Sequence, residues 1–560
     1  MQKRNSYYEK EKMSLSNSRK LVSVWIMVIG ATCVWATDRA GTKCGDLVKT
    51  QIENATISEA VEVPAGKPLT IGGGFTPAVQ ITSLPAHCLV HGEVNHHKGA
   101  DGKDYGDKFE LRMPSNWKGR LLFIGGGGLD GRLNPAIGLQ GPVTTPDSKS
   151  ALTMGYAVVT TDGGHENAGF GMVDGSFGAD PEARADYNYL STKRVTDVAR
   201  KVIAQYYGSP IRYSYFQGCS NGGREGLIAA ERYPSYFDGV IAGSPAFNLT
   251  HAAIAEAWNT VQLATIAPKK PDGTPDLSQS LTESDLKLLV SAILDKCDAL
   301  DGLKDGLIFN PEACHFDPSV LTCKAAQTFN CLPAQKVAVI EAIFRGPHTA
   351  RGNPIYSSWP YDSGDSAQGW RAWMTGFGPT PSINVMIFPQ FFNGLALAGV
   401  PPPIDIFKFN FETDPARIDK ASAEINATAT DWSSFRAGNA KLLLYVGMSD
   451  PVFSANDLLR FYKQIEQSNG GERKTESFAR LFLVPGMNHC SGGPGLDDFD
   501  TLGTMQAWVE EGKVPQRIIS SGQAFPGRTR PLCAYPLTAI YDGHGNPEDA
   551  ASFNCRLPKK

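Results

Sequence analysis

Helix-like and strand-like stretches alternate on both sides of one glycine-flanked serine, and this alternation constrains the fold more than any other feature. Residues 191–207 carry apolar side chains at helical spacing, and Ser191 is a suitable N-cap for them. Short apolar strands are expected at 213–217 and 237–242, with a helix through 225–232 between them. Strand, helix and strand in this order favour a parallel sheet covered by helices.

The same alternation of strands and helices occurs upstream of these residues and again late in the chain. Strand-like runs end in glycine turns between residues 106 and 165, and apolar strands recur at 441–446 and 481–484. Helices are expected at 456–467 and from residue 505 to residue 511. We therefore predict an α/β core with a mainly parallel sheet flanked by helices.

The middle of the chain differs from this core. Residues 248–438 contain long loops, four cysteines and many aromatic residues, without regular strand–helix alternation. We predict one catalytic domain from residues 37–247 and 439–560, with 248–438 inserted as a lid domain at the edge of the sheet. A separate tandem domain is the alternative, and insertion is favoured because candidate catalytic residues lie on both sides of the segment.

Length and charge limit the function classes. A chain of 560 residues exceeds what one ordinary core can use, which agrees with a core plus an insertion. The formal net charge of −4 gives no reason to expect a nucleic-acid partner or electrostatic attachment to a membrane.

The N-terminus has the pattern of a secretory signal peptide. Residues 21–36 carry no charge and follow Arg19 and Lys20, and Val34 and Ala36 are small residues before a plausible cleavage point. The run is short for a membrane span, although an uncleaved anchor is the alternative. We expect residues 1–36 to be removed and the mature protein to be secreted or periplasmic, with no membrane attachment.

Cysteine usage agrees with export. Removing Cys33 with the signal leaves ten of the 11 cysteines, and an even number in an exported chain indicates disulfides. No pair has the C-x2-C spacing of a zinc site. Sequence spacing alone does not fix the pairing, but three close couples suggest local loops. These are Cys297 with Cys314, Cys323 with Cys331, and Cys533 with Cys555.

Gly218-Cys219-Ser220-Asn221-Gly222 fits the motif G-x-S-x-G between a strand and a helix. The motif makes a sharp turn that exposes a serine hydroxyl, and the flanking glycines allow close backbone packing. The helix that follows points N–H groups at a developing oxyanion. A simple glycine-rich turn is the alternative interpretation.

A serine nucleophile needs a base, and the base needs an orienting acid. Asp450 and His489 each follow an apolar strand, in the chain order usual for this motif, while His165 is the main competing histidine. Cys219 directly precedes Ser220 and Cys490 directly follows His489. If these cysteines pair, the disulfide brings nucleophile and base within reach, because the α-carbons of a disulfide lie about 5.5 Å apart. A disulfide unrelated to chemistry is the alternative.

The sequence resembles the tannase and feruloyl esterase family, which also contains an enzyme that hydrolyses mono(2-hydroxyethyl) terephthalate. The resemblance is carried by YSYFQGCSNGGREGL, RYPSYFDGVIAGSPAFN, YVGMSDP, VPGMNHCSGGPG and AWVEEGKVPQRI, and it extends from about residue 44 to Cys555. It implies an α/β-hydrolase fold with the triad Ser220, Asp450 and His489 and the bridge Cys219–Cys490. We also expect Cys44 to pair with Cys88.

An acyl-transfer site further needs oxyanion donors. The first is expected to be the backbone N–H of Asn221, and the second comes from the glycine run 125–128, where we favour Gly128. A flexible or phosphate-binding loop is the alternative for that run, but no helix with a lysine follows it.

Residues 298–307 (DALDGLKDGL) place three carboxylates among glycines, which suits an oxygen-coordinated Ca²⁺. The segment is not an EF-hand, and a solvated acidic turn is the alternative. Similar segments of the resembling family bind calcium. By that resemblance Asp298, Asp301 and Asp305 give carboxylates, Leu303 and Leu307 give carbonyls, and the ion is structural within the lid. No organic cofactor is expected.

These features predict an exported serine carboxylesterase. The resemblance implies a small aromatic ester as its substrate, with feruloyl, hydroxycinnamoyl or galloyl esters as the first choice. The terephthalate monoester is the alternative, and the resemblance implies a lid arginine for it. Residues 373–393 contain no arginine, so one would have to come from elsewhere, such as Arg371 or Arg417. Rivals are a serine peptidase of the same fold, a binding protein on an inactive hydrolase scaffold, and a calcium-dependent adhesive protein. Oligomeric state is not predicted.

Overall fold

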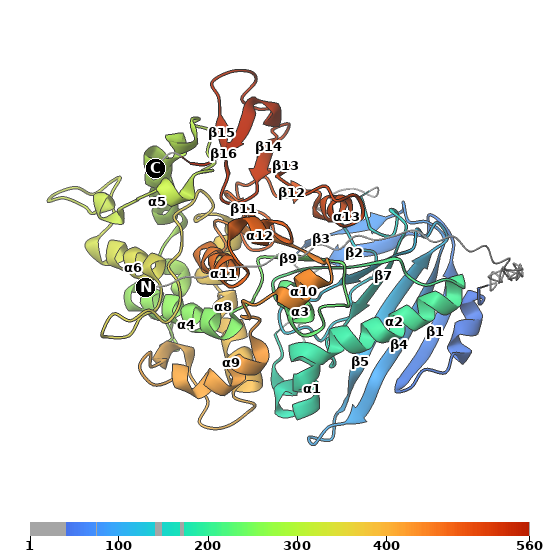
Figure 1. Cartoon of the computed structure of the whole chain (residues 1–560). Coiled ribbons are helices and arrows are strands. Elements are labelled where there is room, and N and C mark those ends of the chain that lie inside the picture. The colour runs from blue at the N-terminus through green and yellow to red at the C-terminus, as the bar shows by residue number, and fades with distance from the viewer. Residues whose placement is uncertain (1–40, 74–75, 141–147, 168–172, 559–560) are drawn as a thin grey trace, which may run out of the picture. The chain divides into compact units, whose positions relative to one another are not determined.

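The computed structural model describes residues 41–73, 76–140, 148–167 and 173–558 (Figure 1). These residues form one compact unit. The predicted signal peptide lies outside the described residues. Within the described ranges, none of the helices combines the length and the apolar character that a membrane crossing requires.

The core is built on a nine-stranded sheet, and the chain does not visit its strands in sequence order. The strands in spatial order are β1 (Ala55–Val63), β4 (His87–Lys98), β5 (Asp104–Pro114), β7 (Tyr156–Thr161), β6 (Arg120–Ile124), β8 (Tyr213–Cys219), β9 (Gly239–Gly243), β10 (Lys441–Gly447) and β11 (Ala479–Val484). The run from β7 to β11 is parallel, and β1, β4 and β5 add to it as an antiparallel edge. The expectation of an α/β fold with a mainly parallel sheet is confirmed.

Alternate side chains of the strands enter two separate cores, because successive residues of a strand point to opposite faces. In β6, Leu121 and Phe123 pack in one core and Leu122 in the other, and all three are fully buried. Helices cover both faces, as a buried parallel sheet requires. The helices of this core are α1 (Pro181–Ala185), α2 (Ser191–Tyr207), α3 (Asn221–Arg232), α11 (Ala455–Ser468), α12 (Glu472–Glu476) and α13 (Thr501–Glu511).

The predicted helix over 191–207 has the observed bounds of α2, but Ser191 is not its N-cap. A five-residue π-helical stretch, Asp186–Leu190, runs directly into α2, so the backbone of Leu190 is already helical. The N-cap of the preceding helix α1 is Asp180, whose carboxylate accepts hydrogen bonds from the N–H groups of Glu182 and Ala183. The cap prediction was therefore wrong, because the helical run starts ten residues earlier.

The sheet continues across the long middle segment, since β9 and β10 are direct parallel neighbours. That segment forms a helical body, which lies beside the sheet in Figure 1 and supplies most of the residues of two further hydrophobic clusters. Its α-helices are α4 (Leu249–Ile266), α5 (Glu283–Cys297), α6 (Ala334–Arg345), α7 (Gln368–Met374), α8 (Ile383–Pro389), α9 (Asp419–Ile425) and α10 (Ser433–Ala437). We call residues 248–438 the lid.

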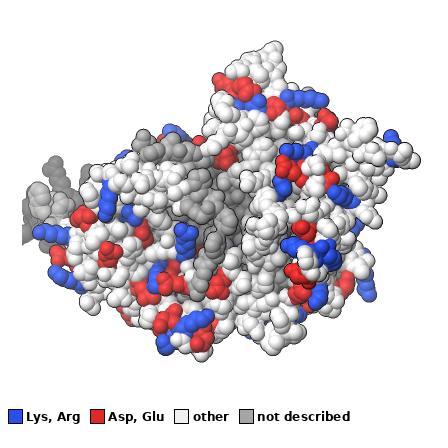
Figure 2. All heavy atoms as spheres, turned by 180° about the vertical axis from the view of Figure 1, so that it is seen from behind, with Lys and Arg blue, Asp and Glu red and all other residues white. Residues whose placement is uncertain are grey.

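Small sheets and short turns complete the molecule. The strands outside the main sheet are β2 (Leu69–Gly73), β3 (Thr76–Ile81), β12 (Asp498–Phe499), β13 (Arg517–Ser521), β14 (Arg530–Cys533), β15 (Thr538–Tyr541) and β16 (Phe553–Arg556). On the face shown in Figure 2, basic and acidic side chains are interspersed. A mixed surface of this kind does not create the one-signed field that attracts a polyanion.

Candidate active site

Ser220 occupies a sharp turn between β8 and α3. Its backbone has φ 62° and ψ −126°, which is a strained conformation for a residue with a side chain. Neighbouring backbone holds the turn: the Ser220 N–H donates to Gly243 O at 3.0 Å, and the Ser220 carbonyl accepts from Ala246 N at 3.0 Å. This strand–turn–helix geometry raises the serine above the carboxyl end of the sheet, as a nucleophile requires.

The two glycines of the motif are required by close backbone approach. A Cβ on Gly218 would collide with the backbone of Gly222, and a Cβ on Gly222 would lie 2.6 Å from Gly126 O. Such separations are shorter than real Cβ contacts. The turn at Ser220 is thus packed directly against the glycine run after β6.

His489 and Asp450 form a hydrogen-bonded pair at the ends of neighbouring strands β11 and β10. His489 Nδ1 lies 2.9 Å from Asp450 Oδ2, and the Asp450 side chain is fully buried. The other carboxylate oxygen accepts backbone N–H groups of Val452 at 2.9 Å and Phe453 at 3.1 Å. These bonds fix the carboxylate, so the imidazole is held with its Nε2 edge away from Asp450.

The disulfide Cys219–Cys490 joins the serine turn to the histidine loop, with the α-carbons 6.0 Å apart. Within the described residues no hydrogen bond joins Ser220 Oγ to His489 Nε2, which lies 3.7 Å from Cys490 Sγ. Such bonds are often long before substrate binds. The other disulfides are also the predicted ones: Cys44–Cys88, Cys297–Cys314, Cys323–Cys331 and Cys533–Cys555.

A lid residue, Asp362, links the loop after β10, which carries Asp450, to the loop after β11, which carries His489. One of its oxygens accepts from Ser449 Oγ at 2.6 Å and from Gly486 N at 2.7 Å. Asn488 adds a second tie by donating to the carbonyls of Ser449 and Gly364, both at 3.1 Å. Sequence reasoning missed both side chains, because their partners come from segments far apart in the chain.

The predicted oxyanion donors lie where backbone N–H groups are free. The N–H groups of Asn221, Gly127 and Gly128 donate to no acceptor among the described residues, whereas Gly126 N donates to Glu225 Oε2 at 3.1 Å. Gly128 has φ +60°, a conformation that favours glycine. Both Gly127 and Gly128 therefore remain available as the second donor.

His165 does not share the environment of His489. It is 3% exposed, stacks on Phe177 with ring centroids 3.7 Å apart, and hydrogen-bonds through Nε2 to Leu129 O at 2.9 Å. Burial lowers its pKa to about 4, which keeps the ring neutral. It thus supports the loop after the glycine run rather than pairing with a carboxylate.

Aromatic rings from the lid and the acid loop surround the imidazole. Trp373 of α7 and Phe453 each meet the His489 ring edge-on, at centroid distances of 5.5 Å and 5.4 Å. Three other aromatic residues of the lid, Phe388, Phe391 and Phe392, pack in a hydrophobic cluster between the lid and the catalytic core. An aromatic wall beside the imidazole suits a flat apolar acyl group.

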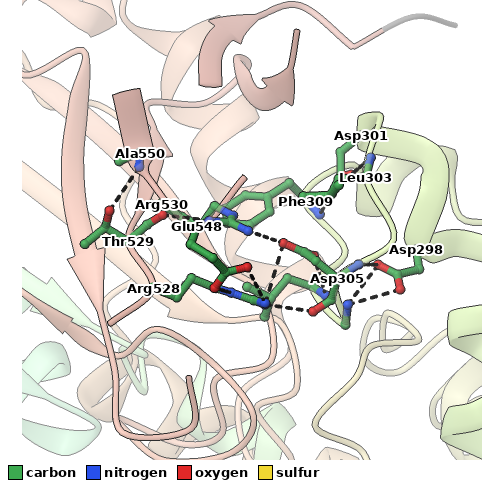
Figure 3. Close-up of polar contacts among 12 residues, drawn as sticks. Asp298, Asp301, Leu303, Asp305, Phe309, Arg528, Thr529, Arg530, Glu548 and Ala550 are labelled. Carbon is green, nitrogen blue, oxygen red and sulfur yellow. Dashed lines mark hydrogen bonds and ion pairs between the residues drawn. The ribbon is translucent and has the colours of Figure 1, made fainter. Parts of the chain in front are cut away.

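The acidic loop of the lid lies against the C-terminal strands (Figure 3). Asp298 accepts from the N–H groups of Asp305 and Gly306, and Asp301 accepts from those of Leu303 and Phe309. Figure 3 shows Asp305 directed instead to Arg528 and Arg530. As the side chains lie, no three acidic, histidine or cysteine groups of the described residues could hold a metal ion together.

The donor chemistry of this loop nevertheless fits calcium. All side-chain donors are hard carboxylate oxygens, and the carbonyls of Leu303 and Leu307 accept no hydrogen bond from a described residue. Burial raises the pKa of Asp301 to about 7 and also raises that of Asp298. Convergence of the three carboxylates would require Asp305 to leave the guanidinium of Arg530.

Comparison with known proteins points in one direction. The sequence profile described as "Tannase and feruloyl esterase" matches residues 88–556. The chain is 40% identical over 525 residues to mono(2-hydroxyethyl) terephthalate hydrolase of Piscinibacter sakaiensis, covering 85% of this chain and 86% of that protein. It is 26% identical to a probable feruloyl esterase B-2 of Neosartorya fischeri, covering 96% and 99% of the two chains.

Solved structures agree. Feruloyl esterase B from Aspergillus oryzae superposes with a TM-score of 0.76 at 26% identity, over 92% of this chain and 99% of the other. Tannin acyl hydrolase from Aspergillus niger gives a TM-score of 0.67 at 21% identity, over 90% and 92%, and supports the fold alone.

Proposed function

This chain belongs to the tannase and feruloyl esterase family, and from that premise we propose that Ser220, His489 and Asp450 cleave phenolic esters through an acyl-serine intermediate. The protein is a carboxylesterase of the phenolic-ester class. The observation that carries the assignment of residues is the His489–Asp450 pair tied by Cys219–Cys490 to the strained serine turn.

Each residue has a defined chemical task in this proposal. Asp450 holds the proton on Nδ1 of His489, so the lone pair on Nε2 takes the proton of Ser220 as its oxygen attacks the ester carbonyl. The N–H groups of Asn221 and Gly128 stabilise the resulting oxyanion. His489 then protonates the leaving alcohol, and water attacks the acyl-serine by the same steps in reverse.

For the acyl group we propose a neutral phenolic acid, of the hydroxycinnamoyl or galloyl kind. A charged acyl group would need a free cation in the lid, and the two candidate arginines are engaged. Arg371 pairs with Glu283 at 2.7 Å and lies over the Phe377 ring at 5.0 Å, and Arg417 donates to Pro402 O at 2.6 Å.

A terephthalate monoester is the second candidate substrate. The observation that favours it is the 40% identity to a protein named mono(2-hydroxyethyl) terephthalate hydrolase, which exceeds the 26% identity to the feruloyl esterases compared above. Its free carboxylate would have to displace Glu283 from Arg371. The exposed fraction of the Glu283 side chain is 51%, so the pair lies where such an exchange is sterically open.

A substrate panel tests both candidates. We expect kcat/KM for methyl ferulate or methyl gallate to exceed that for mono(2-hydroxyethyl) terephthalate by at least about 10-fold, and Ser220→Ala to abolish all three activities. A higher kcat/KM for mono(2-hydroxyethyl) terephthalate would establish the terephthalate monoester as the substrate. In that case Arg371→Ala should raise KM for the terephthalate ester alone.

Two further measurements address the rival classes. Matched amides of the best ester substrate should turn over far more slowly than the ester, which separates an esterase from a peptidase of the same fold. A fluorophosphonate probe should label Ser220. Lack of labelling together with lack of ester turnover would instead support a binding protein on a hydrolase scaffold.

We also propose that the acidic loop holds a structural Ca²⁺, with carboxylates from Asp298, Asp301 and Asp305 and carbonyls from Leu303 and Leu307. Two observations support it: the all-oxygen donor set and the burial of Asp298 and Asp301, which are 8% and 3% exposed. Titration of Ca²⁺ into chelator-treated protein should show one site in the wild type and none in Asp301→Asn.

Finally, we propose that the protein is exported, to the periplasm or beyond. Five disulfides between described residues support this, because such bonds persist in oxidising compartments. Cell fractionation of the expressed full chain, with N-terminal sequencing of the mature protein, tests export and cleavage before Thr37 together.

A further inference from the structure

The side chain of Asn221 is the centre of a buried polar cluster beneath the proposed oxyanion hole. Its amide nitrogen donates to Asp130 Oδ1 at 3.0 Å and to Glu225 Oε1 at 2.9 Å, and its oxygen accepts from Arg224 Nε at 2.7 Å. All four side chains are buried, with at most 7% exposed. We call Asp130, Asn221, Arg224 and Glu225 the oxyanion cluster.

The cluster joins the two segments that supply the oxyanion donors. Glu225 Oε2 accepts the N–H of Gly126 at 3.1 Å, which ties α3 to the glycine run. A Cβ on Gly126 would lie 2.6 Å from Asp130 Oδ1, so the turn is packed directly onto this carboxyl group. Asn221 itself is the residue whose backbone N–H is the first proposed donor.

The hydrogen-bond donors and acceptors of the cluster indicate that one of its carboxyl groups is protonated. The carboxyl groups of Asp130 and Glu225 accept from the same amide nitrogen, that of Asn221, and two carboxylates held this close in a buried cluster would repel each other. Both oxygens of Glu225 already accept N–H donors, whereas Asp130 Oδ2 is buried and accepts from no donor in the described part of the chain. The proton therefore belongs on Asp130, and Glu225 is the carboxylate.

Charge balance gives the same answer. Arg224 is fully buried and forms no ion pair with a described residue; its guanidinium donates to Asn221 and to backbone carbonyls, including Ile425 O of the lid at 3.1 Å. One carboxylate in the cluster balances this single positive charge. A second would leave an uncompensated charge in the interior, which is strongly unfavourable.

We propose that the carboxyl groups of Asp130 and Glu225 hold one proton between them, which is carried by Asp130. The two residues are positioning residues: they hold the N-terminus of α3, at Asn221, and the 125–128 turn together so that both contribute to one oxyanion hole. Neither residue touches the substrate. The proposal rests on the acyl-transfer function and the oxyanion donors proposed above. It predicts that the two carboxyl groups respond oppositely to the same conservative change.

The remaining titratable groups around the pair do not compete for this role. Burial and the Glu225 carboxylate raise the pKa of Asp130 well above its usual value, while Arg224 opposes the shift. Burial also raises the pKa of Tyr187, whose hydroxyl donates to Gly128 O at 2.8 Å. His165, on the Leu129 carbonyl, stays neutral because burial lowers its pKa to about 4.

Isosteric variants separate the two members of the pair. Asp130→Asn keeps a neutral group with a donor toward Glu225, and Asn tolerates the positive φ of 40° at this position. We expect its kcat to remain within about threefold of wild type at neutral pH. Glu225→Gln places an amide donor against an existing N–H donor, so kcat should fall roughly 10- to 100-fold with KM little changed, as for a displaced oxyanion donor.

The pH profile is the readout that a merely structural role would not move. Wild-type kcat should decline on the alkaline side as Asp130 loses its proton, and Asp130→Asn should lack this decline. Glu256→Gln is the matched control, because Glu256 is a buried lid carboxyl whose pKa burial raises to about 8. It should keep the wild-type alkaline limb.

The outcomes decide between the possibilities. The shared-proton pair would be overturned if kcat of Asp130→Asn declined at alkaline pH as in the wild type. It would also be overturned if Asp130→Asn and Glu225→Gln lowered kcat equally. If Glu225→Gln unfolds, difference infrared spectra of wild type against folded Asp130→Asn still decide, since the proposal requires a protonated-carboxyl band that Asp130→Asn lacks. Absence of ester hydrolysis by the wild type would instead refute the proposed function.

Discussion

At the scale of single residues, Asp450 illustrates how one carboxylate sets the chemistry of its partner. Its two oxygens accept the N–H of His489 on one side and two backbone N–H groups on the other. An amide at this position would offer an N–H to His489 Nδ1 and so favour the wrong tautomer.

Asp450→Asn should therefore lower kcat by roughly 10³- to 10⁴-fold with little change in KM. Steady-state kinetics on the best ester and a thermal melt check this, since the fold should be retained. Asp457→Asn is the control: it removes a buried carboxylate at the start of α11 that binds Asn248 and Arg460 instead. Comparable losses in both variants would refute the assignment.

His165 gives a prediction for stability against pH. Burial holds its pKa at about 4 in the folded protein, compared with 6.5 for an unperturbed histidine. Between these values the unfolded chain binds a proton that the folded chain does not. The free energy of unfolding should thus decrease as pH falls from about 6.5 to about 4, by on the order of 3 kcal/mol from this group.

His165→Gln removes the titration while keeping a donor for Leu129 O. The variant should be less stable than wild type at pH 7, because it loses the stack on Phe177, and the difference should shrink toward pH 4. Urea unfolding of both proteins across this range measures it. A difference that stays constant with pH would show that His165 does not titrate in the way described.

At the scale of elements, the disulfide Cys219–Cys490 couples two loops that are separated by 271 positions. Replacing both cysteines by alanine should lower kcat at least 10-fold, because His489 is then free to move from Ser220. The chain-entropy relation for such a loop gives a loss of about 5.6 kcal/mol in the free energy of unfolding.

Cys323→Ala with Cys331→Ala is the matched control, since that bridge closes only eight positions within the lid. It should lower the free energy of unfolding by about 2.5 kcal/mol and leave kcat unchanged. Activity assays and denaturant unfolding of both double variants test the contrast. Full activity without Cys219–Cys490 would mean that other contacts, such as those of Asp362, suffice to hold the site.

The elements near the site follow largely from local sequence. The helix predicted from the apolar face of 191–207 has the bounds of α2. The predicted strand KLLLYV is one residue shorter than β10, and the predicted strand LFLV is two residues shorter than β11. The cap at Ser191 was wrong because tertiary packing extends helical backbone upstream through Asp186. Local preference alone cannot indicate such an extension.

The site itself was predictable only in part. Ser220, Asp450 and His489 stand in motifs at strand ends, and their flanking cysteines indicated which strand ends meet. Asp130, Asp362 and Glu225 carry no such signal, because their partners are brought to them by the folded sheet and lid. A buried carboxyl with a remote partner looks, in sequence, like any surface acidic residue.

At the scale of the whole molecule, many contacts attach the lid to the catalytic core, and three of them bear on the site or on the calcium proposal. Asp362 binds the acid and histidine loops, Ile425 O accepts from Arg224 beneath the oxyanion turn, and Asp305 binds Arg528 and Arg530 of the C-terminal segment. Two of these attachments reach residues beside the proposed triad or oxyanion hole. The position of the lid and the geometry of the site are therefore coupled.

The third attachment predicts how calcium acts on the molecule. The acidic loop contacts the C-terminal segment through Arg528, which donates to Asp305 O at 2.8 Å and pairs with Glu548 at 2.8 Å. A bound cation would neutralise the carboxylates of the loop and hold it in shape against that segment. Chelation should lower the melting temperature and speed proteolysis of the acidic loop. At low temperature, kcat should stay near that of the untreated protein.

Arg528→Met separates the cation from its attachment. It removes the tie while leaving the five proposed ligands in place, so the variant should still bind Ca²⁺ in a titration but gain less thermal stability from it than wild type does. Asp542→Asn, in the exposed turn after β15, is the control and should respond to Ca²⁺ as the wild type does. If chelator leaves the wild-type melting temperature unchanged, the loop is a solvated acidic turn held by its own N–H groups and arginines, and the calcium proposal fails.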